Sequence, residues 1–310
     1  MRRAKRTDPM ARRTVVFGAT LLAGLTLATV AHAGNPQIAG LQVALRAYGL
    51  YNGPIDAIAG PKTVLATKEF QRRVGLVPDG RAGPATRRAL GPLGTPVFGR
   101  RTLHRGSFGW DVSVLQYMLA RRGRLVPVYG FFDAATERAL RSYQRTKRLA
   151  ADGIAGPRTL HALGHATPGV RAVRPAPAPA PATSVRTMLT NWAIAYRLDP
   201  ALVRALGWME SGFQPGLVSS AGARGVLQVL PVTRGYVEHQ LIGHKVPRST
   251  SGNIRIGVVY LRQLLREFRW DRDRALAAWY QGPASVRHHG PLASTRLFVS
   301  NVLALRGRGV

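Results

Sequence analysis

An internal repeat constrains this chain of 310 residues more than any other feature of its sequence. Phe70-Gln71 recurs as Tyr143-Gln144, and the segment 79–86 recurs as 152–159, in both cases 73 residues later. Each copy of that segment begins Asp-Gly and continues through Gly-Pro-x-Thr. Because a register kept over separate matches indicates duplication, the chain before residue 165 is predicted to hold two copies of one small domain.

Each copy has the signals of short helices. Leu41-Gln42 recurs as Leu115-Gln116, 74 residues later, which places one extra residue in the first loop. Gly-Pro-x-Thr occurs at 60–63, 83–86 and 156–159. Proline at the first helical position is favoured because its missing N–H has no partner to lose there. Three short helices joined by Gly-rich turns are therefore predicted for each copy, packed as a small bundle.

The order of these signals resembles the peptidoglycan-binding domain of the three-helix type. The resemblance covers residues 36–92 and 108–165. The second copy departs from the pattern at 131–136, where Phe-Phe-Asp-Ala-Ala-Thr replaces the Ile-Ala-Gly-Pro-Lys-Thr of 58–63, so the two copies are not expected to bind equally. The Asp, Gly and Thr residues of 79–86 are predicted to form turns and helix caps rather than to contact a ligand.

A Pro- and Ala-rich segment separates the repeats from the rest of the chain. Alternating Pro and Ala favours an extended polyproline-type spacer, so residues 166–184 are predicted to be a linker. Residues 185–310 then form a third domain, with the spacing of a run of helices.

The N-terminus has the layout of a secretory signal peptide. Arg12 and Arg13 precede an uncharged stretch from Thr14 to Val30, and Ala31-His32-Ala33 follows as a small-x-small cleavage signal. Residues 1–33 are predicted to be removed on export to the periplasm, the cell wall or the medium. The apolar run is slightly short for a spanning helix, so no stable membrane span is expected after cleavage; an uncleaved anchor is the alternative.

The chain is strongly basic and has no cysteine. Lys and Arg total 45 against 14 Asp and Glu, a net charge of +31. Such a surplus of positive charge favours polyanionic partners. Because an exported protein rarely meets nucleic acid, peptidoglycan and anionic wall polymers are the expected partners. The alternative is that the charge only keeps the surface solvated. The absence of cysteine excludes disulfides, thiol nucleophiles and Cys-ligated metals. The histidines at 239, 244, 288 and 289 lack a credible ligand set, so neither a metal nor a cofactor is predicted.

Glu210 is the candidate catalytic residue. Asp199-Pro200 opens a helix with an N-cap and a first-turn proline, and Gly212 ends it. Glu210 shares a face of that helix with Leu206 and Val203. A carboxyl against apolar surface has a raised pKa, which suits a general acid. At this stage a helix-end glutamate that faces water is an equal alternative.

The segment that starts at Glu210 carries a second resemblance. Glu-Ser is followed by Ser219, Ala-Gly-Ala-x-Gly at 221–225 and Gln228 between apolar residues, and two further motifs stand at 253–261 and 275–283. Residues 186–305 resemble the goose-lysozyme-like soluble lytic transglycosylases. This resemblance implies a mainly α chain, with a lysozyme-like α-helical catalytic domain beside the two three-helix bundles. The substrate-binding residues that it implies are Ser219, Gln228, Leu230, Tyr260, Trp279 and Tyr280.

The resemblance also implies a reaction. Glu210 would cleave the bond between N-acetylmuramic acid and N-acetylglucosamine as an acid, then act as a base while the sugar's 6-hydroxyl closes a 1,6-anhydro ring. The acids elsewhere after the linker lack the context of a second catalytic carboxylate. The family's late motif reads Tyr-Asn-Ala-Gly, but here Trp279 takes the Tyr place and Tyr280 the Asn place. A hydrolytic muramidase and a non-catalytic wall-binding protein are the alternatives.

Overall fold

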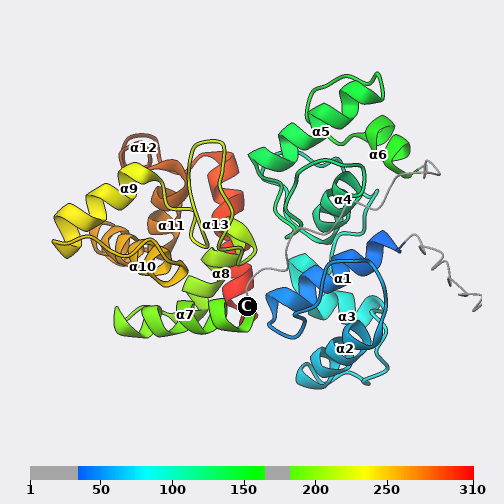
Figure 1. The fold of residues 1–310 in the computed structure, drawn as a ribbon, viewed down its shortest axis with the longest axis horizontal. Coiled ribbons are helices and arrows are strands. Elements are labelled where there is room, and N and C mark those ends of the chain that lie inside the picture. Colours follow the sequence, from blue (N-terminus) through cyan, green and yellow to red (C-terminus); the bar gives the residue numbers. More distant parts are fainter. Residues whose placement is uncertain (1–33, 165–181) are drawn as a thin grey trace, which may run out of the picture. The chain divides into compact units, whose positions relative to one another are not determined.

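The computed structural model describes residues 34–164 and 182–310, and these residues form helices joined by turns (Figure 1). Isolated β-bridges occur, but the described ranges contain no β-strand. The predicted mainly α class is therefore confirmed. The predicted signal peptide and nearly all of the predicted linker lie outside the described residues.

Each copy of the repeat forms three α-helices, as predicted. The first copy contains α1 (Pro36–Ala47), α2 (Pro61–Arg73), α3 (Pro84–Ala89) and a short 3-10 turn, η1 (Gly91–Leu93). The second contains α4 (Trp110–Ala120), α5 (Ala134–Thr146) and α6 (Pro157–Gly164). The three Gly-Pro signals each stand at a helix start, so their proline occupies the first helical position.

A buried glutamine ties the last turn of each copy together. Gln71 Nε2 donates to Asp79 Oδ1 at 2.7 Å, to the backbone oxygen of Arg81 at 3.0 Å and to Thr86 Oγ1 at 3.1 Å. Its Oε1 accepts from the N–H of Gly80 at 2.8 Å. In the second copy Gln144 makes the same four bonds, to Asp152, Ile154, Thr159 and Gly153, at 2.8, 3.0, 3.2 and 3.0 Å. The repeated motif thus holds a turn against a helix start. As predicted, Asp79 and Gly80 lie in the turn before α3 and Gly83 is its N-cap, whereas Thr86 lies within the first turn of the helix.

The first half of each copy uses a second buried glutamine in the same way. Gln42 Nε2 donates to Thr63 Oγ1 at 3.2 Å, and Gln116 Nε2 donates to Thr136 Oγ1 at 2.9 Å. All four of these side chains are buried. The glutamine–threonine pair therefore survives where the second copy departs from the first in sequence.

The two copies differ beside this pair. Gln42 Nε2 also donates to Asp56 Oδ1, at 2.6 Å. The residue 73 positions after Asp56 is Tyr129, and Gln116 Oε1 accepts from its backbone N–H at 3.0 Å instead. The side chain at position 129 is therefore released from the glutamine network.

The region after the linker consists of eight helical elements. They are α7 (Ala182–Ala195), α8 (Pro200–Ser211), α9 (Pro231–Tyr236), the π-helical η2 (Val237–Ile242), α10 (Thr250–Glu267), α11 (Arg272–Gln281), α12 (Pro283–His289) and α13 (Ala293–Arg306). Helix α7 includes the last three residues of the predicted linker and begins directly after the last proline of the Pro/Ala run. In the parts of the chain described by the structure, no helix combines the length and apolar character needed to cross a membrane.

Helix α8 lies at the centre of this region. It packs against α7 on one side and α13 on the other, while α10 contacts α7 and α11. Val203 and Leu206, predicted to share a face with Glu210, are fully buried. The core therefore fixes α8, and with it the position of the last turn, where Glu210 lies.

Candidate active site

Helix α8 is fixed at both ends by the residues predicted from the sequence. The Asp199 carboxylate accepts from the N–H of Ala201 at 2.8 Å, with Pro200 at the first helical position. Gly212 ends the helix in the left-handed region, at a φ of 60°, where a residue without a Cβ is favoured. These caps place Glu210 on the last turn of a rigid helix.

The Glu210 carboxyl is largely desolvated, and it accepts one hydrogen bond, which favours its charged form. Trp279 Nε1 donates to Glu210 Oε1 at 2.8 Å. Burial raises the pKa of Glu210 to about 7, although the hydrogen bond from Trp279 lowers it. Because desolvation disfavours the carboxylate, both protonation states are populated near neutral pH. This agrees with the predicted position of the carboxyl against apolar surface.

A row of aromatic rings leads to the carboxyl. The Trp279 ring on α11 lies 5.5 Å from that of Tyr260 on α10, at an interplanar angle of 47°. Tyr260 in turn meets the ring of Tyr236 on α9 edge-on, at 6.4 Å. Three helices thus place aromatic faces beside Glu210, and such rings are suited to stacking on sugars.

Tyr280 points into a different environment from Trp279. Its ring stacks on Phe298 of α13, with centroids 4.4 Å apart and planes within 18°. Burial raises the pKa of Tyr280, and the charge of Glu210 acts in the same direction. The structure therefore brings both residues of the divergent late motif into the neighbourhood of Glu210, but only Trp279 bonds to it.

The predicted residues Ser219 and Gln228 hold the loop that follows α8. Ser219 Oγ accepts from the N–H of Ala223 at 3.0 Å. Gln228 Nε2 donates to the backbone oxygens of Leu217 and Gly225, at 3.1 and 2.9 Å. The amide nitrogen of Gln228 is therefore used within the loop. Leu230, the residue before α9, is 37 % exposed.

Asn253 on α10 fastens this loop to the helical core. Its Oδ1 accepts from the N–H of Leu227 at 3.2 Å, and its Nδ2 donates to the backbone oxygen of Arg224 at 2.8 Å. A Cβ on Gly225, whose φ is 76°, would lie 2.6 Å from the Asn253 amide. The sequence marks both residues as motif positions, but only the structure gives their role, which is to position the loop.

The second copy of the repeat reaches the end of α8, a contact that the sequence analysis did not predict. Tyr129 is 1 % exposed, and a Cβ on Gly212 would lie 2.4 Å from its Cβ. Phe131 meets Phe298 edge-on at 6.1 Å. Burial raises the pKa of Tyr129, the charge of Asp133 adds to this, and that of Glu210 contributes further. The one available signal was the repeat register, which aligns Tyr129 with Asp56.

Four of the other acids of this region have partners of their own. Glu238 is buried and pairs with Arg234 at 2.9 Å and Lys245 at 3.4 Å. Glu267 pairs with Arg287, Asp271 caps α11 and lies 3.8 Å from Arg274, and Asp199 binds Arg306. The sequence predicts ion pairs for Glu267, Asp271 and Asp273, since all three lie among arginines; the first two form them, and Asp273 forms none with the described residues. Across residues 34–164 and 182–310, no group of three or more His, Cys, Asp or Glu side chains could hold a metal ion.

Comparisons with known families identify the domains. Residues 34–90 and 109–163 match the model of a peptidoglycan binding domain, within two residues of the predicted ranges. Residues 187–297 match the model of the transglycosylase SLT domain. The chain carries two peptidoglycan-binding domains followed by an SLT domain. Its late motif, with Trp279 bonded to Glu210, is a departure within that family pattern.

Curated relatives share parts of this chain. The soluble lytic murein transglycosylase of Salmonella typhimurium is 26% identical over 141 residues, 38% of this chain and 21% of that protein. That of Escherichia coli K12 is 29% identical over 124 residues, 32% of this chain and 19% of that protein. The N-acetylmuramoyl-L-alanine amidase CwlM of Mycobacterium tuberculosis is 42% identical over 102 residues, 32% and 25% of the two chains. The chain thus spans a quarter or less of the length of these relatives.

Two solved structures are also similar. An inactive mutant of the lytic transglycosylase Slt from Pseudomonas aeruginosa has a TM-score of 0.38 and 19% identity, over 88% of this chain and 41% of that chain. The 70 kDa soluble lytic transglycosylase of Escherichia coli has a TM-score of 0.37 and 24% identity, over 39% and 23% of the two chains.

Proposed function

We propose that this protein is a peptidoglycan lytic transglycosylase with Glu210 as its single catalytic residue. It cleaves the β-1,4 bond between N-acetylmuramic acid and N-acetylglucosamine and leaves a 1,6-anhydro ring on the muramic acid. The observation that carries the proposal is the Glu210 carboxyl, whose pKa is raised to about 7 within an SLT domain.

One carboxyl serves both steps of the reaction. Protonated Glu210 gives its proton to the glycosidic oxygen, and the bond from that oxygen to the anomeric carbon of muramic acid breaks. The substrate's N-acetyl group stabilises the cation that develops there. The Glu210 carboxylate then takes the proton of the 6-hydroxyl, whose oxygen bonds to the anomeric carbon, so the acid is regenerated and no water is consumed. A pKa near the working pH suits a group that must donate and then accept.

The surroundings of Glu210 give the predicted binding residues distinct roles. Trp279 stabilises the carboxylate through its indole N–H, and Tyr260 continues the aromatic wall. Since Gln228 Nε2 is occupied in the loop, its Oε1 is the atom left to accept from an acetamido N–H. Ser219 and Leu230 border the same loop, and Tyr280 presents its phenol beside Glu210.

The remaining domains bring the enzyme to its substrate. The two peptidoglycan-binding domains support peptidoglycan glycan strands as the partner. Residues 1–33 serve as a signal peptide, residues 166–181 as a linker, and the catalytic domain runs to residue 310. The enzyme acts outside the cytoplasm, where its substrate lies.

The test is mass spectrometry of the soluble products released from purified peptidoglycan. Products with anhydromuramic ends, one water lighter than hydrolysis products, are expected from the wild type and should vanish with Glu210→Gln. Glu267→Gln makes the same chemical change at an ion-paired surface acid and should leave the products unchanged. Reducing ends would identify a hydrolytic muramidase instead. Protein that pellets with the wall and releases nothing would identify a non-catalytic binding protein.

The pH profile provides a second test through Trp279. Its hydrogen bond favours the charged form of Glu210, so Trp279→Phe should raise the pKa of that carboxyl above about 7 and move the alkaline limb of kcat to higher pH. Trp270→Phe makes the same change at an exposed indole and serves as the control. An unchanged limb in Trp279→Phe would show that another group controls it.

A further inference from the structure

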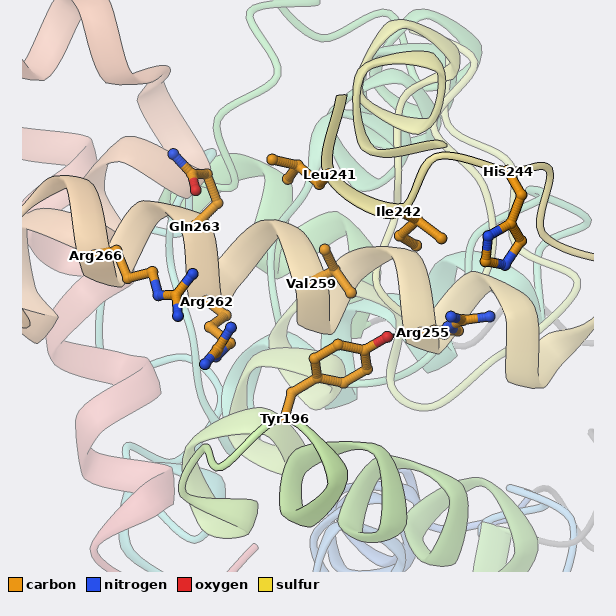
Figure 2. Close-up of a pocket in the computed structure, with 9 residues that line it drawn as sticks. All are labelled: Tyr196, Leu241, Ile242, His244, Arg255, Val259, Arg262, Gln263 and Arg266. Carbon is orange, nitrogen blue, oxygen red and sulfur yellow. Dashed lines mark hydrogen bonds between the residues drawn. The ribbon is translucent and has the colours of Figure 1, made fainter. Parts of the chain in front are cut away.

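A concave site lies on α10, with residues of the helix faces next to Tyr260 in its lining. It is a pocket of about 270 Å³ between α10, the end of α7 and the turn after η2 (Figure 2). Tyr260, on one side of α10, touches Trp279, whereas Arg262, two residues further, lines the pocket. Two residues along an α-helix correspond to about 200° of rotation. The arginine edge of the pocket thus lies on a different face of α10 from Tyr260.

Three arginines form one edge of the pocket. Arg255, Arg262 and Arg266 are spaced by seven and four residues, which places them in one stripe along α10 (Figure 2). None of the three forms a salt bridge with any acid in the described parts of the chain, and the neighbouring Glu267 is paired with Arg287. Like charges gathered without counter-charges repel one another, so the stripe is poised to bind an anion.

Arg255 is fixed by contacts with aromatic residues, and Arg262 has an unsatisfied hydrogen-bond donor. The Arg255 guanidinium lies over the Trp192 ring at 5.4 Å, and its Nε donates to the Tyr196 hydroxyl at 3.1 Å. Its terminal N–H groups thus keep a fixed direction while staying available. Arg262 Nε is buried and has no hydrogen-bond partner among the described residues, a state that a bound acceptor would relieve.

The spacing of the arginines selects among anions. Successive charges lie about 10 Å and about 6 Å apart along the helix axis. One carboxylate is satisfied by a single guanidinium fork, whereas a row of this length matches a chain that carries an anion at every repeat. A tetrahedral phosphate also offers acceptor oxygens in more than one plane, so guanidinium groups on successive turns can share it. The apolar side chains of Leu241, Ile242 and Val259 line the same pocket and would contact the carbon atoms between phosphates.

We propose that this pocket binds a phosphate-bearing polymer of the cell envelope, independently of the glycan site. The choice of an envelope polymer rests on the proposed function. The choice of a polymer linked by phosphodiesters rests on the row of three arginines. Helix α10 would then hold the wall's glycan strand on one face and its anionic polymer on another, which keeps the enzyme at regions of the wall that carry both.

The test is isothermal titration of the full-length Glu210→Gln chain with poly(glycerol phosphate) at physiological salt. Replacing Arg255, Arg262 and Arg266 together by Gln should lower the affinity by about tenfold or more, since charge-assisted hydrogen bonds are lost. The matched control replaces Arg272, Arg274 and Arg296, exposed residues of α11 and α13, and should lower it by about twofold or less, as expected of screened surface charges. Equal losses in the two variants would overturn the proposal.

Two further measurements keep the test decisive. Without ligand, the pocket variant loses charge repulsion but also the contacts of Arg255 with Trp192 and Tyr196, so the affinities are compared below both melting temperatures. If the variant does not fold, Arg262→Gln alone replaces it. Single-stranded DNA and polyglutamate of equal charge are titrated in parallel. If DNA or polyglutamate binds through the same arginines more tightly than poly(glycerol phosphate), the assignment to a phosphodiester polymer of the envelope is overturned. Since the titration needs no turnover, its outcome is separate from that of the product analysis.

Discussion

The two copies of the repeat keep the same internal framework and differ in how they meet the catalytic domain. Gln71 and Gln144 make matching sets of four hydrogen bonds. The first copy meets the catalytic domain through two arginines: Arg308 Nη1 donates to the backbone oxygen of Ala89 at 2.9 Å, and Arg186 Nη1 donates to that of Ala47 at 2.5 Å. The second meets it through the buried rings of Tyr129 and Phe131.

This difference explains where the second copy departs in sequence. Position 56, which bonds the glutamine network in the first copy, becomes Tyr129 in the second and packs on Gly212. Position 58, 51 % exposed as Ile58, becomes the buried Phe131. In the first copy this edge meets the second copy, where the Tyr117 hydroxyl donates to the backbone oxygen of Asp56 at 3.0 Å. In the second copy the same edge packs against the catalytic domain. Unequal binding by the two copies stays a prediction; the edge that differs between them is the one that the second copy buries.

The largest effect is expected from Tyr129→Ala. Removing this buried ring should lower the free energy of unfolding by about 3–5 kcal/mol, as for other large aromatic truncations. It should also slow glycan cleavage, because the last turn of α8 loses its support beside Glu210. The check is calorimetry together with the cleavage rate measured well below the melting temperature.

Asp56→Ala, at the corresponding position of the first copy, is the matched control for Tyr129→Ala. It should cost about 1–2 kcal/mol for the lost bond to Gln42 and leave the cleavage rate unchanged. Equal effects of the two variants on cleavage would remove the distinction between the copies.

An intermediate and equal effect is expected from Gln71→Leu and Gln144→Leu. Each removes four hydrogen bonds and leaves buried partners unsatisfied, which should cost about 2–4 kcal/mol. Denaturant titrations of the two variants should agree closely if the frameworks are equivalent. A large difference would mean that docking of the second copy supports its glutamine network as well.

The smallest effect is expected from Arg308→Gln. Its bond to Ala89 is exposed, so the loss in the free energy of unfolding should be about 0.5–1 kcal/mol. The melting temperature should change little, and cleavage should be unaffected. A loss as large as that of Tyr129→Ala would show that both copies are docked with similar strength.

The features that could be predicted from the sequence are those encoded by neighbouring residues. Gly-Pro pairs mark three helix starts, Asp199 and Gly212 bound α8, and the spacing of Val203, Leu206 and Glu210 predicts the raised pKa. Each depends on local backbone geometry or on the period of a helix.

The features that escaped prediction depend on contacts between distant segments. The bond between Trp279 and Glu210 joins residues 69 positions apart, and the loop bonds of Ser219 and Gln228 depend on a fold that motif matching does not supply. The contact of Tyr129 with Gly212 could be predicted only by knowing that the second copy of the repeat packs against the catalytic domain. The arginine stripe of α10 is visible in the sequence, but its missing counter-charges are not.

The indole beside Glu210 also has an optical consequence. Indole N–H donates a hydrogen bond but cannot accept a proton, so Trp279 stays chemically constant while the carboxyl against it alternates between neutral and charged. The fluorescence of Trp279 should therefore change when the Glu210 carboxyl beside it gains or loses its negative charge. With only five tryptophans in the chain, this one could report the ionisation of the active site directly, without any substrate or label.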